Sequence, residues 1–480
     1  MRTYSAVATL DESGEHSQTA IGCAMRKVLV LAYRFPPQGG GGVQRTLKFV
    51  KYLPAAGWLP VVHTVSNPDW PLSDPTLLGE VPPFVKVSRS RTFEFERLAR
   101  TTDGLLAREE DGGARPAGAP KPRTERRGGV ARRALKALAG LVQRHALVPD
   151  PQIAWVPGAL FKSLSLIRRE GVSLIYSSSP PNSGQVLALL LKRVTGLPWI
   201  ADFRDPWTEG IRRKQAYETS RVRGWLEHAF ERAVMAHADH VVVTTEKTRE
   251  QYLAKYPTVP AAKFSVITNG FDPADFALAP STDGLLDARQ FNMTLTGNVE
   301  AMFDATPFFA AVKELIDEDD DLRTHLRVNF VGTKRGKYDR FIREHGLEST
   351  VQYIGYVPHQ TSLRYLAESD ALFLCQIPVY ESATTKLSGK LFEYLYMRKP
   401  ILALTIPGLT TDILSRSGLG VAVDPDDRPG IKKALRDLYV RWRDGHGGPP
   451  ADETYIETFD RSLQTKRLAG LFDRLAERRA

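Results

Sequence analysis

The chain has 480 residues, 42% of them hydrophobic and 25% charged, and its formal net charge is +10. This length exceeds what a single hydrophobic core usually serves, so two domains are predicted, and no apolar run is long enough to span a bilayer. The two cysteines, Cys23 and Cys375, exclude a disulfide framework or a zinc site and favour a reducing, cytoplasmic setting. No nucleic-acid-binding module or basic patch interleaved with aromatic residues occurs, so a nucleic-acid partner is not predicted.

The sequence of the first part of the chain predicts a half-Rossmann unit, in which a strand is followed by a glycine-rich turn and a helix. Residues 1–25 lack an apolar segment and are expected to form a disordered extension. The apolar run of Lys27–Tyr33 predicts a buried parallel strand, and residues 59–65 are predicted to form a second strand. Between them, Gly39–Gly42 begins a helix whose N-terminus suits an anion, although a merely flexible loop is equally common. Gln44 replaces the last glycine of the dinucleotide fingerprint, which argues against a Rossmann oxidoreductase.

A basic segment follows. Residues 100–130 are rich in Gly, Pro, Ala, Arg and Glu and predict a disordered insertion. Residues 130–144 predict a helix with an apolar stripe opposite Arg and Lys. Such a helix binds an anionic membrane surface or a phosphorylated acceptor, or else packs on its own domain as a solvated helix. The sequence leaves these alternatives open.

Polar residues then gather at the end of a strand. Val172–Ser178 is a strand, and LPWIADFRDPW is a strand running into a loop. Asp202, Arg204 and Asp205 lie in that loop, at the edge where open α/β sheets bind ligands. The alternative is an Asp–Arg ion pair that fixes the loop, and both interpretations are compatible.

A second strand–helix alternation predicts a second domain. Residues 277–290 have the composition of a linker, and a strand follows from Phe291. A helix is predicted from Ser388 and Gly389 to Lys399-Pro400, since proline disfavours helical geometry in the residue before it. Gly389 and Lys390 lie one turn before Glu393, so a polar ligand can approach the carboxylate beside a cation. An ordinary solvent-facing Glu–Lys pair is the simpler alternative.

From Lys27 to about Leu475, leaving out the insertion, the chain resembles the GT-B glycosyltransferases, in particular the large retaining family 4. The segments that carry the resemblance are Ile267-Thr-Asn-Gly-Phe-Asp272, Leu295-Thr-Gly-Asn298, Phe330-Val-Gly332, Val351–Val357 and Lys390-Leu-Phe-Glu-Tyr-Leu395. The resemblance implies an α/β, GT-B fold. Two Rossmann-like, doubly wound domains then face each other across a cleft, and a C-terminal helix crosses back to the first domain.

The domain boundaries that follow are an extension at 1–25, a first domain at 26–276, a linker at 277–290, a second domain at 291–458 and a C-terminal helix at 459–480. The resemblance also implies a nucleotide-diphosphate sugar held by the second domain and an acceptor held by the first. Glu393 matches the carboxylate that binds the donor ribose, and Gly389 and Lys390 face the diphosphate. Thr296, Gly297 and Asn298 lie beneath the scissile bond.

Two departures from the family pattern concern charge. The region after Asn298 has no cation where relatives carry Arg and Lys, and Thr385 stands where relatives have a first glutamate. Lys334, Arg335 and Lys386 are substitutes for the missing cations, together with Lys390 and Arg204. No metal or other cofactor is expected, because cationic side chains offset the diphosphate charge.

The predicted function is therefore transfer of a sugar, with retention, from a nucleotide-diphosphate sugar to a glycan or lipid-linked glycan precursor, in the cytoplasm or at the inner face of the plasma membrane. The predicted catalytic residues are Asp205, Arg204 and Asn298. The predicted donor-binding residues are Glu393, Lys390, Gly389, Thr296, Gly297, Lys334, Arg335, Lys386 and Leu391, and the predicted acceptor loop is Gly39, Gly40, Gly41 and Gly42. A nucleotide-sugar 2-epimerase of the same fold and a catalytically silent partner protein are the alternatives.

Overall fold

The computed structural model describes residues 25–68, 72–92, 147–209, 221–277, 284–297, 304–332, 336, 338–376 and 387–478. The chain divides into two compact units. Unit 1 comprises residues 1–242, 258–263 and 465–480, and unit 2 comprises residues 243–257 and 264–464. The predicted extension at 1–25, except Met25, the insertion at 100–130 and the basic helix at 130–144 lie outside the described residues.

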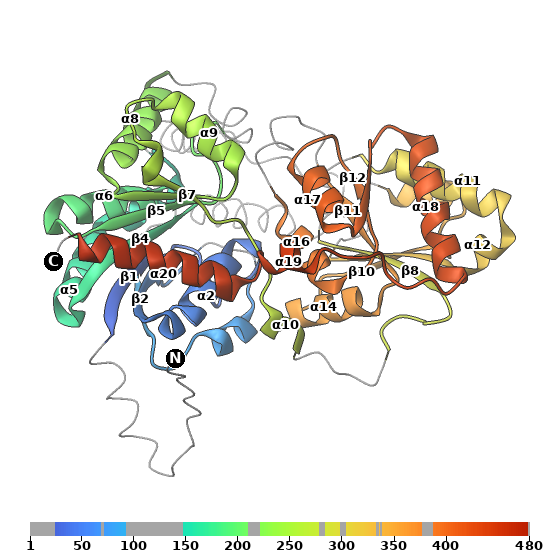
Figure 1. Cartoon of the computed structure of the whole chain (residues 1–480), viewed down its shortest axis with the longest axis horizontal. Coiled ribbons are helices and arrows are strands. Elements are labelled where there is room, and N and C mark those ends of the chain that lie inside the picture. The colour runs from blue at the N-terminus through green and yellow to red at the C-terminus, as the bar shows by residue number, and fades with distance from the viewer. Residues whose placement is uncertain are drawn as a thin grey trace, which may run out of the picture. The chain divides into compact units, whose positions relative to one another are not determined.

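The first sheet has seven strands in the order β3-β2-β1-β4-β5-β6-β7 (Figure 1). The strands are β1 (Arg26–Leu31), β2 (Trp58–Val65), β3 (Lys86–Ser90), β4 (Val172–Ser179), β5 (Trp199–Phe203), β6 (His240–Val243) and β7 (Phe264–Val266). β1 pairs in parallel with β2 and β4, and β4 with β5. The order reverses between β1 and β4, which is the switch point where doubly wound sheets bind ligands.

Helices cover both faces of this sheet. They are α2 (Gly41–Tyr52), α5 (Val156–Glu170), α6 (Ser183–Thr195), α8 (Arg221–His237) and α9 (Glu246–Lys255), with short 3-10 helices η1 (Pro54–Ala56), η2 (Pro75–Glu80), η3 (Pro151–Trp155) and η4 (Ala261–Lys263). Two successive side chains of β4 contact helices on opposite faces of the sheet, because neighbouring residues of a strand point to opposite sides. Tyr176 packs against Phe49 of α2, whereas Ser177 donates to Gln185 of α6 at 2.6 Å.

The last helix, α20 (Arg461–Glu477), enters unit 1 at residue 465. Its Phe472 lies edge-on to Trp58 and tilted against Tyr176, and Trp58 Nε1 donates to Asp473 at 3.0 Å. Figure 1 shows α20 in red along the first sheet. The C-terminal helix therefore returns to the first domain, as the family resemblance implies.

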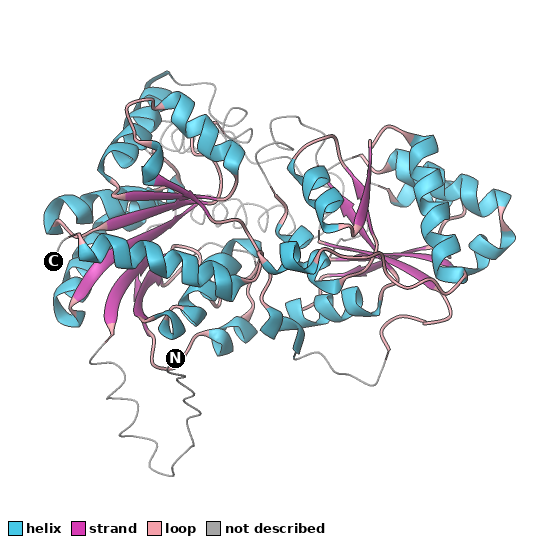
Figure 2. Cartoon of the chain, viewed as in Figure 1, coloured by secondary structure: helices cyan, strands magenta, loops and turns pink. Residues whose placement is uncertain are grey.

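The second sheet has six strands in the order β10-β9-β8-β11-β12-β13, with every neighbouring pair parallel. The strands are β8 (Phe291–Thr296), β9 (Leu326–Val331), β10 (Val351–Gly355), β11 (Ala371–Cys375), β12 (Ile401–Leu404) and β13 (Gly420–Val423). Helices surround the strands, as Figure 2 shows. They are α10 (Pro273–Ala277), α11 (Thr306–Glu318), α12 (Asp320–His325), α13 (Asp339–Glu344), α14 (His359–Glu368), α16 (Gly389–Met397), α17 (Leu409–Ser417), α18 (Arg428–Arg443) and α19 (Glu453–Glu457).

This sheet separates two hydrophobic clusters. Phe373 and Cys375 of β11 belong to the cluster beneath α11 and α18, and the alternate residues Leu372 and Leu374 to the cluster around α16. The strands are apolar on both faces because both faces are covered. The predicted α/β fold with two doubly wound parallel sheets is confirmed. Among the described residues, no helix combines the length and hydropathy that a membrane span requires.

Side-chain caps and glycines set many helix ends. Thr245 accepts from the backbone N–H of Thr248 at 3.1 Å and begins α9, and Gly196 ends α6 in the left-handed conformation. Arg398 is the C-cap of α16 and has φ 54°. Its guanidinium bonds the carbonyls of Leu395 and Tyr396 and the carboxylate of Glu453, which offset the strain of that conformation.

Candidate functional site

The switch point of the second sheet lies between β8 and β11, and glycines end the two strands β8 and β9 there. Gly297 has φ +94° and Gly332 has φ +97°, a region that side chains disfavour. An ideal Cβ on Gly332 would lie 3.1 Å from the Cα of Gly297, so the two backbones touch. The N–H of Gly297 donates to the carbonyl of Val331 at 2.6 Å. This packing brings the main chain of the two glycines together at the carboxyl edge of the sheet.

Lys390 places its ammonium group at that edge. An ideal Cβ on Gly297 would lie 2.3 Å from Lys390 Nζ and 2.5 Å from its Cε, so the lysine runs directly over the glycine. Burial lowers the pKa of Lys390, while Cys375 at the end of β11 and Glu393 act in the opposite direction. Among the described residues, no carboxylate forms an ion pair with Lys390. A bound anion would relieve the cost of burying this cation.

Glu393 lies one turn further along α16. Its Oε1 is 3.2 Å from Nε2 of His359, the first residue of α14, and both side chains are about one-quarter exposed, at 25% and 22%. The carboxylate is thus held from one side and accessible from the other. A fixed carboxylate of this kind accepts hydrogen bonds from a vicinal diol.

Tyr394 fixes α16 to the sheet beneath the site. Its buried hydroxyl accepts from the N–H of Thr296 at 3.0 Å and donates to the carbonyl of Phe373 at 3.2 Å. Because Thr296 is buried and bonded in this way, it supports Gly297 from below. Leu391 is fully buried among apolar residues, so its side chain serves the core and its predicted contact with a donor is not supported.

The N-terminus of α16 is open. Ser388 makes no side-chain cap, and a Cβ on Gly389 would meet nothing within 4 Å. The partial positive charge of this helix N-terminus therefore adds to the charge of Lys390 in the first turn of α16, as an anion site requires. Asn298, Lys334, Arg335 and Lys386 lie outside the described residues.

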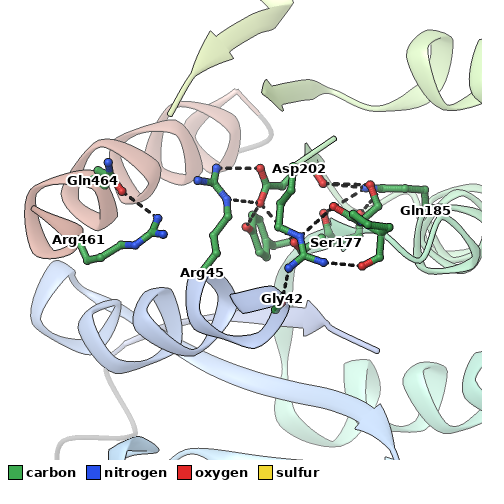
Figure 3. A network of polar contacts seen from close by, with 12 residues as sticks. Gly42, Arg45, Ser177, Gln185, Asp202, Arg461 and Gln464 are labelled. Atoms are coloured by element: carbon green, nitrogen blue, oxygen red, sulfur yellow. Dashed lines mark hydrogen bonds and ion pairs between the residues drawn. The ribbon is translucent and has the colours of Figure 1, made fainter. Parts of the chain in front are cut away.

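In unit 1, the loop residues are tied together differently. Arg45 of α2 forms a two-bond ion pair with Asp202 at 2.8 and 2.9 Å, and Tyr176 donates to the same carboxylate at 2.6 Å. Figure 3 shows this network together with Ser177 and Gln185. The carboxylate and the guanidinium are both buried. Asp202 therefore acts in an ion pair that fixes the loop, and its partner comes from α2 rather than from Arg204.

Arg204 also has a structural position. Its guanidinium donates to the carbonyls of Gly42, Pro180 and Ser179, the last at 3.0 Å, and so joins the glycine loop to the loop after β4. Burial lowers the pKa of Arg204, and the carboxylates of Asp205 and Asp202 act in the opposite direction. With these donors directed at backbone, Arg204 positions the loops, and its predicted catalytic role stays a prediction.

The predicted acceptor loop is shaped by its surroundings. Gly40 has φ +91°, and a Cβ on Gly39 would lie 3.2 Å from the Cβ of Asp74. A Cβ on Gly42 would meet Arg34 at 3.2 Å, whereas Gly41 faces open space. Glycine is thus required by conformation or close approach at three of the four positions.

Sequence reasoning missed Arg34 and His359. Burial and the neighbouring Arg204 lower the pKa of Arg34 to about 10, and Asp150 and Asp205 oppose them. A polar residue just after an apolar strand is the signal that points to Arg34. His359 lies 34 residues before Glu393 on another helix, so no local pattern links the two.

Sequence comparisons agree with this geometry. The model of the glycosyl transferase 4-like domain matches residues 40–270, and that of the glycosyl transferases group 1 matches residues 290–440. The chain is a glycosyltransferase that combines a glycosyl transferase 4-like domain with a glycosyl transferases group 1 domain. Residues Gly297, Lys390 and Glu393 of this glycosyltransferase all lie in the group 1 segment. No curated protein sequence matches the chain.

Solved structures share the GT-B fold of this glycosyltransferase. Sucrose-phosphate synthase from Thermosynechococcus elongatus is 15% identical with a TM-score of 0.58, and the match covers 94% of this chain and 99% of that chain. Anabaena HepE in complex with UDP is 12% identical with a TM-score of 0.56, covering 94% and 100%. WaaG, a glycosyltransferase involved in lipopolysaccharide biosynthesis, is 14% identical with a TM-score of 0.52, covering 92% and 99%. At such identities the likeness shows the fold alone.

Proposed function

We propose that this glycosyltransferase transfers a sugar from a nucleotide-diphosphate sugar to a glycan or lipid-linked glycan precursor, with retention of configuration. The observation that carries the proposal is the position of Lys390, whose ammonium lies against Gly297 one helical turn before Glu393. A cation at a helix N-terminus matches the diphosphate of such a donor, and the accessible carboxylate at the same sheet edge matches its ribose.

Glu393 binds the donor ribose in this proposal. Its carboxylate accepts hydrogen bonds from both ribose hydroxyls, while His359 holds the side chain in place from α14. The structural neighbour HepE is described in complex with UDP and with UDP-glucose, which supports a nucleotide sugar as the donor class. The nucleotide base and the sugar of the donor are to be identified by the binding experiment below.

Lys390 and the first amides of α16 stabilise the leaving diphosphate. The bond between the anomeric carbon and the diphosphate oxygen breaks, negative charge develops on that oxygen, and the nearby ammonium offsets it. The acceptor hydroxyl attacks the same face of the sugar, and its proton leaves with the departing diphosphate. Lys334, Arg335 and Lys386 are proposed as further cations, with Asn298 beside the scissile bond. No metal ion is needed for this charge balance.

The acceptor is proposed to bind unit 1. Asp205 and the loop from Gly39 to Gly42 contact it, while Arg204 holds that loop through the carbonyl of Gly42. With a lipid-linked acceptor, the enzyme would act in the cytoplasm, at the inner face of the plasma membrane. The basic segment 130–144 is a proposed contact with that surface.

A nucleotide-sugar binding panel tests the donor site. UDP-, GDP- and dTDP-linked sugars are titrated against the unmodified chain, Glu393→Ala and the exposed control Glu348→Ala. Loss of the two charge-assisted bonds costs about 2–3 kcal/mol, so Glu393→Ala should bind one nucleotide class roughly thirty- to hundredfold more weakly. Glu348→Ala should bind normally. Equal binding by Glu393→Ala, or no binding by the unmodified chain, would contradict the proposal.

Turnover separates the alternatives. With the nucleotide that binds, transfer to a lipid-linked glycan acceptor supports the glycosyltransferase reaction. Conversion of the donor sugar without an acceptor would indicate a nucleotide-sugar 2-epimerase instead. Tight binding without any turnover would indicate a catalytically silent partner protein.

A further inference from the structure

Large apolar side chains are unusually exposed on one group of helices. Among the described residues, the four large apolar side chains with the highest exposure are Phe161 at 74%, Trp225 at 69%, Val222 at 64% and Val194 at 63%. Phe161 belongs to α5, Val194 to α6, and Val222 and Trp225 to α8. A single exposed apolar residue needs no explanation, but their concentration on three helices does.

These three helices form one layer. α6 packs against both α5 and α8, and α5 and α6 both contact β4. Ser177 of β4 points to α6, whereas its neighbour Tyr176 points to α2 and α20, so the layer covers the opposite face of the sheet. Figure 1 shows α5, α6 and α8 following one another along unit 1. We call the outward side of α5, α6 and α8 the helix-layer surface.

The charge on the helix-layer surface is of one sign. Its exposed cations are Lys162, Arg168, Arg169, Arg193, Arg221 and Arg232. None of these forms an ion pair with another described residue. The acidic residues of the same helices are not exposed, because Glu170 binds Lys86, Glu227 binds Arg223 and Glu231 binds Thr208. The helix-layer surface therefore presents apolar groups and cations without exposed acid.

We propose that the helix-layer surface binds an anionic phospholipid membrane. Tryptophan and phenylalanine insert into the headgroup region, and each Lys or Arg close to anionic lipid strengthens partitioning about fivefold. A membrane fits because the apolar and basic residues are spread over three helices, as contact with a broad surface requires. A nucleic-acid backbone would use the cations but leave Phe161, Val194, Val222 and Trp225 in water. The proposal stands whether or not the donor chemistry is as proposed above.

Vesicle co-sedimentation of the full-length chain tests the proposal. The vesicles are phosphatidylcholine alone, or phosphatidylcholine with one-third phosphatidylglycerol. Binding is expected only to the anionic vesicles, and Phe161→Ala with Trp225→Ala should weaken it about tenfold. Phe84→Ala, a half-exposed aromatic outside the helix-layer surface, should bind as the unmodified chain does. No binding to either vesicle, or binding unchanged by the double variant, would overturn the proposal.

A second set of variants separates this surface from net charge and from segment 130–144. Arg168→Glu with Arg169→Glu should weaken binding more than Arg340→Glu with Lys433→Glu, which changes the net charge equally on unit 2. Equal loss in the two pairs would contradict a defined surface. Loss confined to a variant carrying Arg132→Gln, Arg133→Gln and Lys136→Gln would assign membrane contact to that segment and overturn the helix-layer surface.

Fluorescence gives a position-specific readout. Brominated lipids quench tryptophan that inserts into the bilayer, so quenching by anionic vesicles should occur in the unmodified chain and fall strongly in Trp225→Phe. The phenylalanine keeps the apolar contact, and co-sedimentation of this variant should be nearly unchanged. Quenching that persists in Trp225→Phe would show that Trp225 is not at the membrane, and would overturn its role.

Discussion

The two doubly wound sheets have the same strand order about their switch points but fill those points in opposite ways. At the first switch point, the buried carboxylate of Asp202 accepts hydrogen bonds from Arg45 and Tyr176, while Arg204 donates to three backbone carbonyls. At the second, among the described residues, Lys390 lies over Gly297 without an ion pair, and Glu393 has His359 as its hydrogen-bond partner.

The difference teaches how to distinguish scaffold from site in this fold. A charge whose hydrogen bonds go to protein atoms has less capacity left to bind a ligand, and removing its partner leaves a buried charge uncompensated. A cation without an ion pair at a helix N-terminus keeps that capacity. By this criterion we expect the first switch point to maintain loop geometry and the second to be the donor site.

The variant with the largest expected effect tests whether the ion pair at the first switch point holds the fold together. Asp202→Ala leaves Arg45 buried without its carboxylate, so the free energy of unfolding should fall by about 3–5 kcal/mol. Urea denaturation measures the change. The double variant Arg45→Met with Asp202→Leu should recover much of the loss because neither charge is then present. A stable Asp202→Ala chain would show that the ion pair does not hold the first switch point together.

A glycine substitution tests the site side. Gly297→Ala combines a left-handed backbone with a Cβ only 2.3 Å from Lys390 Nζ. We expect a loss of about 1–3 kcal/mol of stability and at least a roughly tenfold loss of donor affinity, since the lysine must move.

Gly346→Ala is the matched control for this glycine. It has φ +64°, and a Cβ there would meet nothing within 4 Å, so it carries the strain without the clash. Donor affinity should be unchanged in Gly346→Ala. Equal donor affinity in the two variants would mean that the position of Lys390 over Gly297 is unimportant.

The smallest effect concerns pH. Burial lowers the pKa of Lys390 in the folded chain, so the unfolded chain binds more protons between that lowered pKa and the ordinary lysine value of about 10.4. Stability attributable to this lysine should therefore rise with pH across that window. As the pH rises across that window, the difference in unfolding free energy between the unmodified chain and Lys390→Met should shift in favour of the unmodified chain. Lys433→Met, at an exposed lysine, should show no such shift.

Much of the fold was predictable because buried parallel strands are apolar on both faces. The predicted strands at 27–33, 59–65 and 172–178 correspond to β1, β2 and β4, and the helix from Gly389 to α16. β3, with the sequence KVSRS, was not predicted, because it carries no apolar run. The left-handed Arg398 was also missed, since its conformation depends on Glu453, which lies 55 residues away.

The sequence by itself determined the architecture and the identities of Glu393, Lys390 and Gly297 as candidates, because local patterns of strand, glycine and helix N-terminus carry that information. Only the tertiary structure decided which neighbours they have. It placed Lys390 over Gly297, paired His359 with Glu393, and joined Arg204 and Asp202 to partners that fix the loops. It also gathered Phe161, Val194 and Trp225 on one layer of helices. The physical reason is that a side chain's role depends on the partners it meets across the fold, and those partners lie far away in the chain.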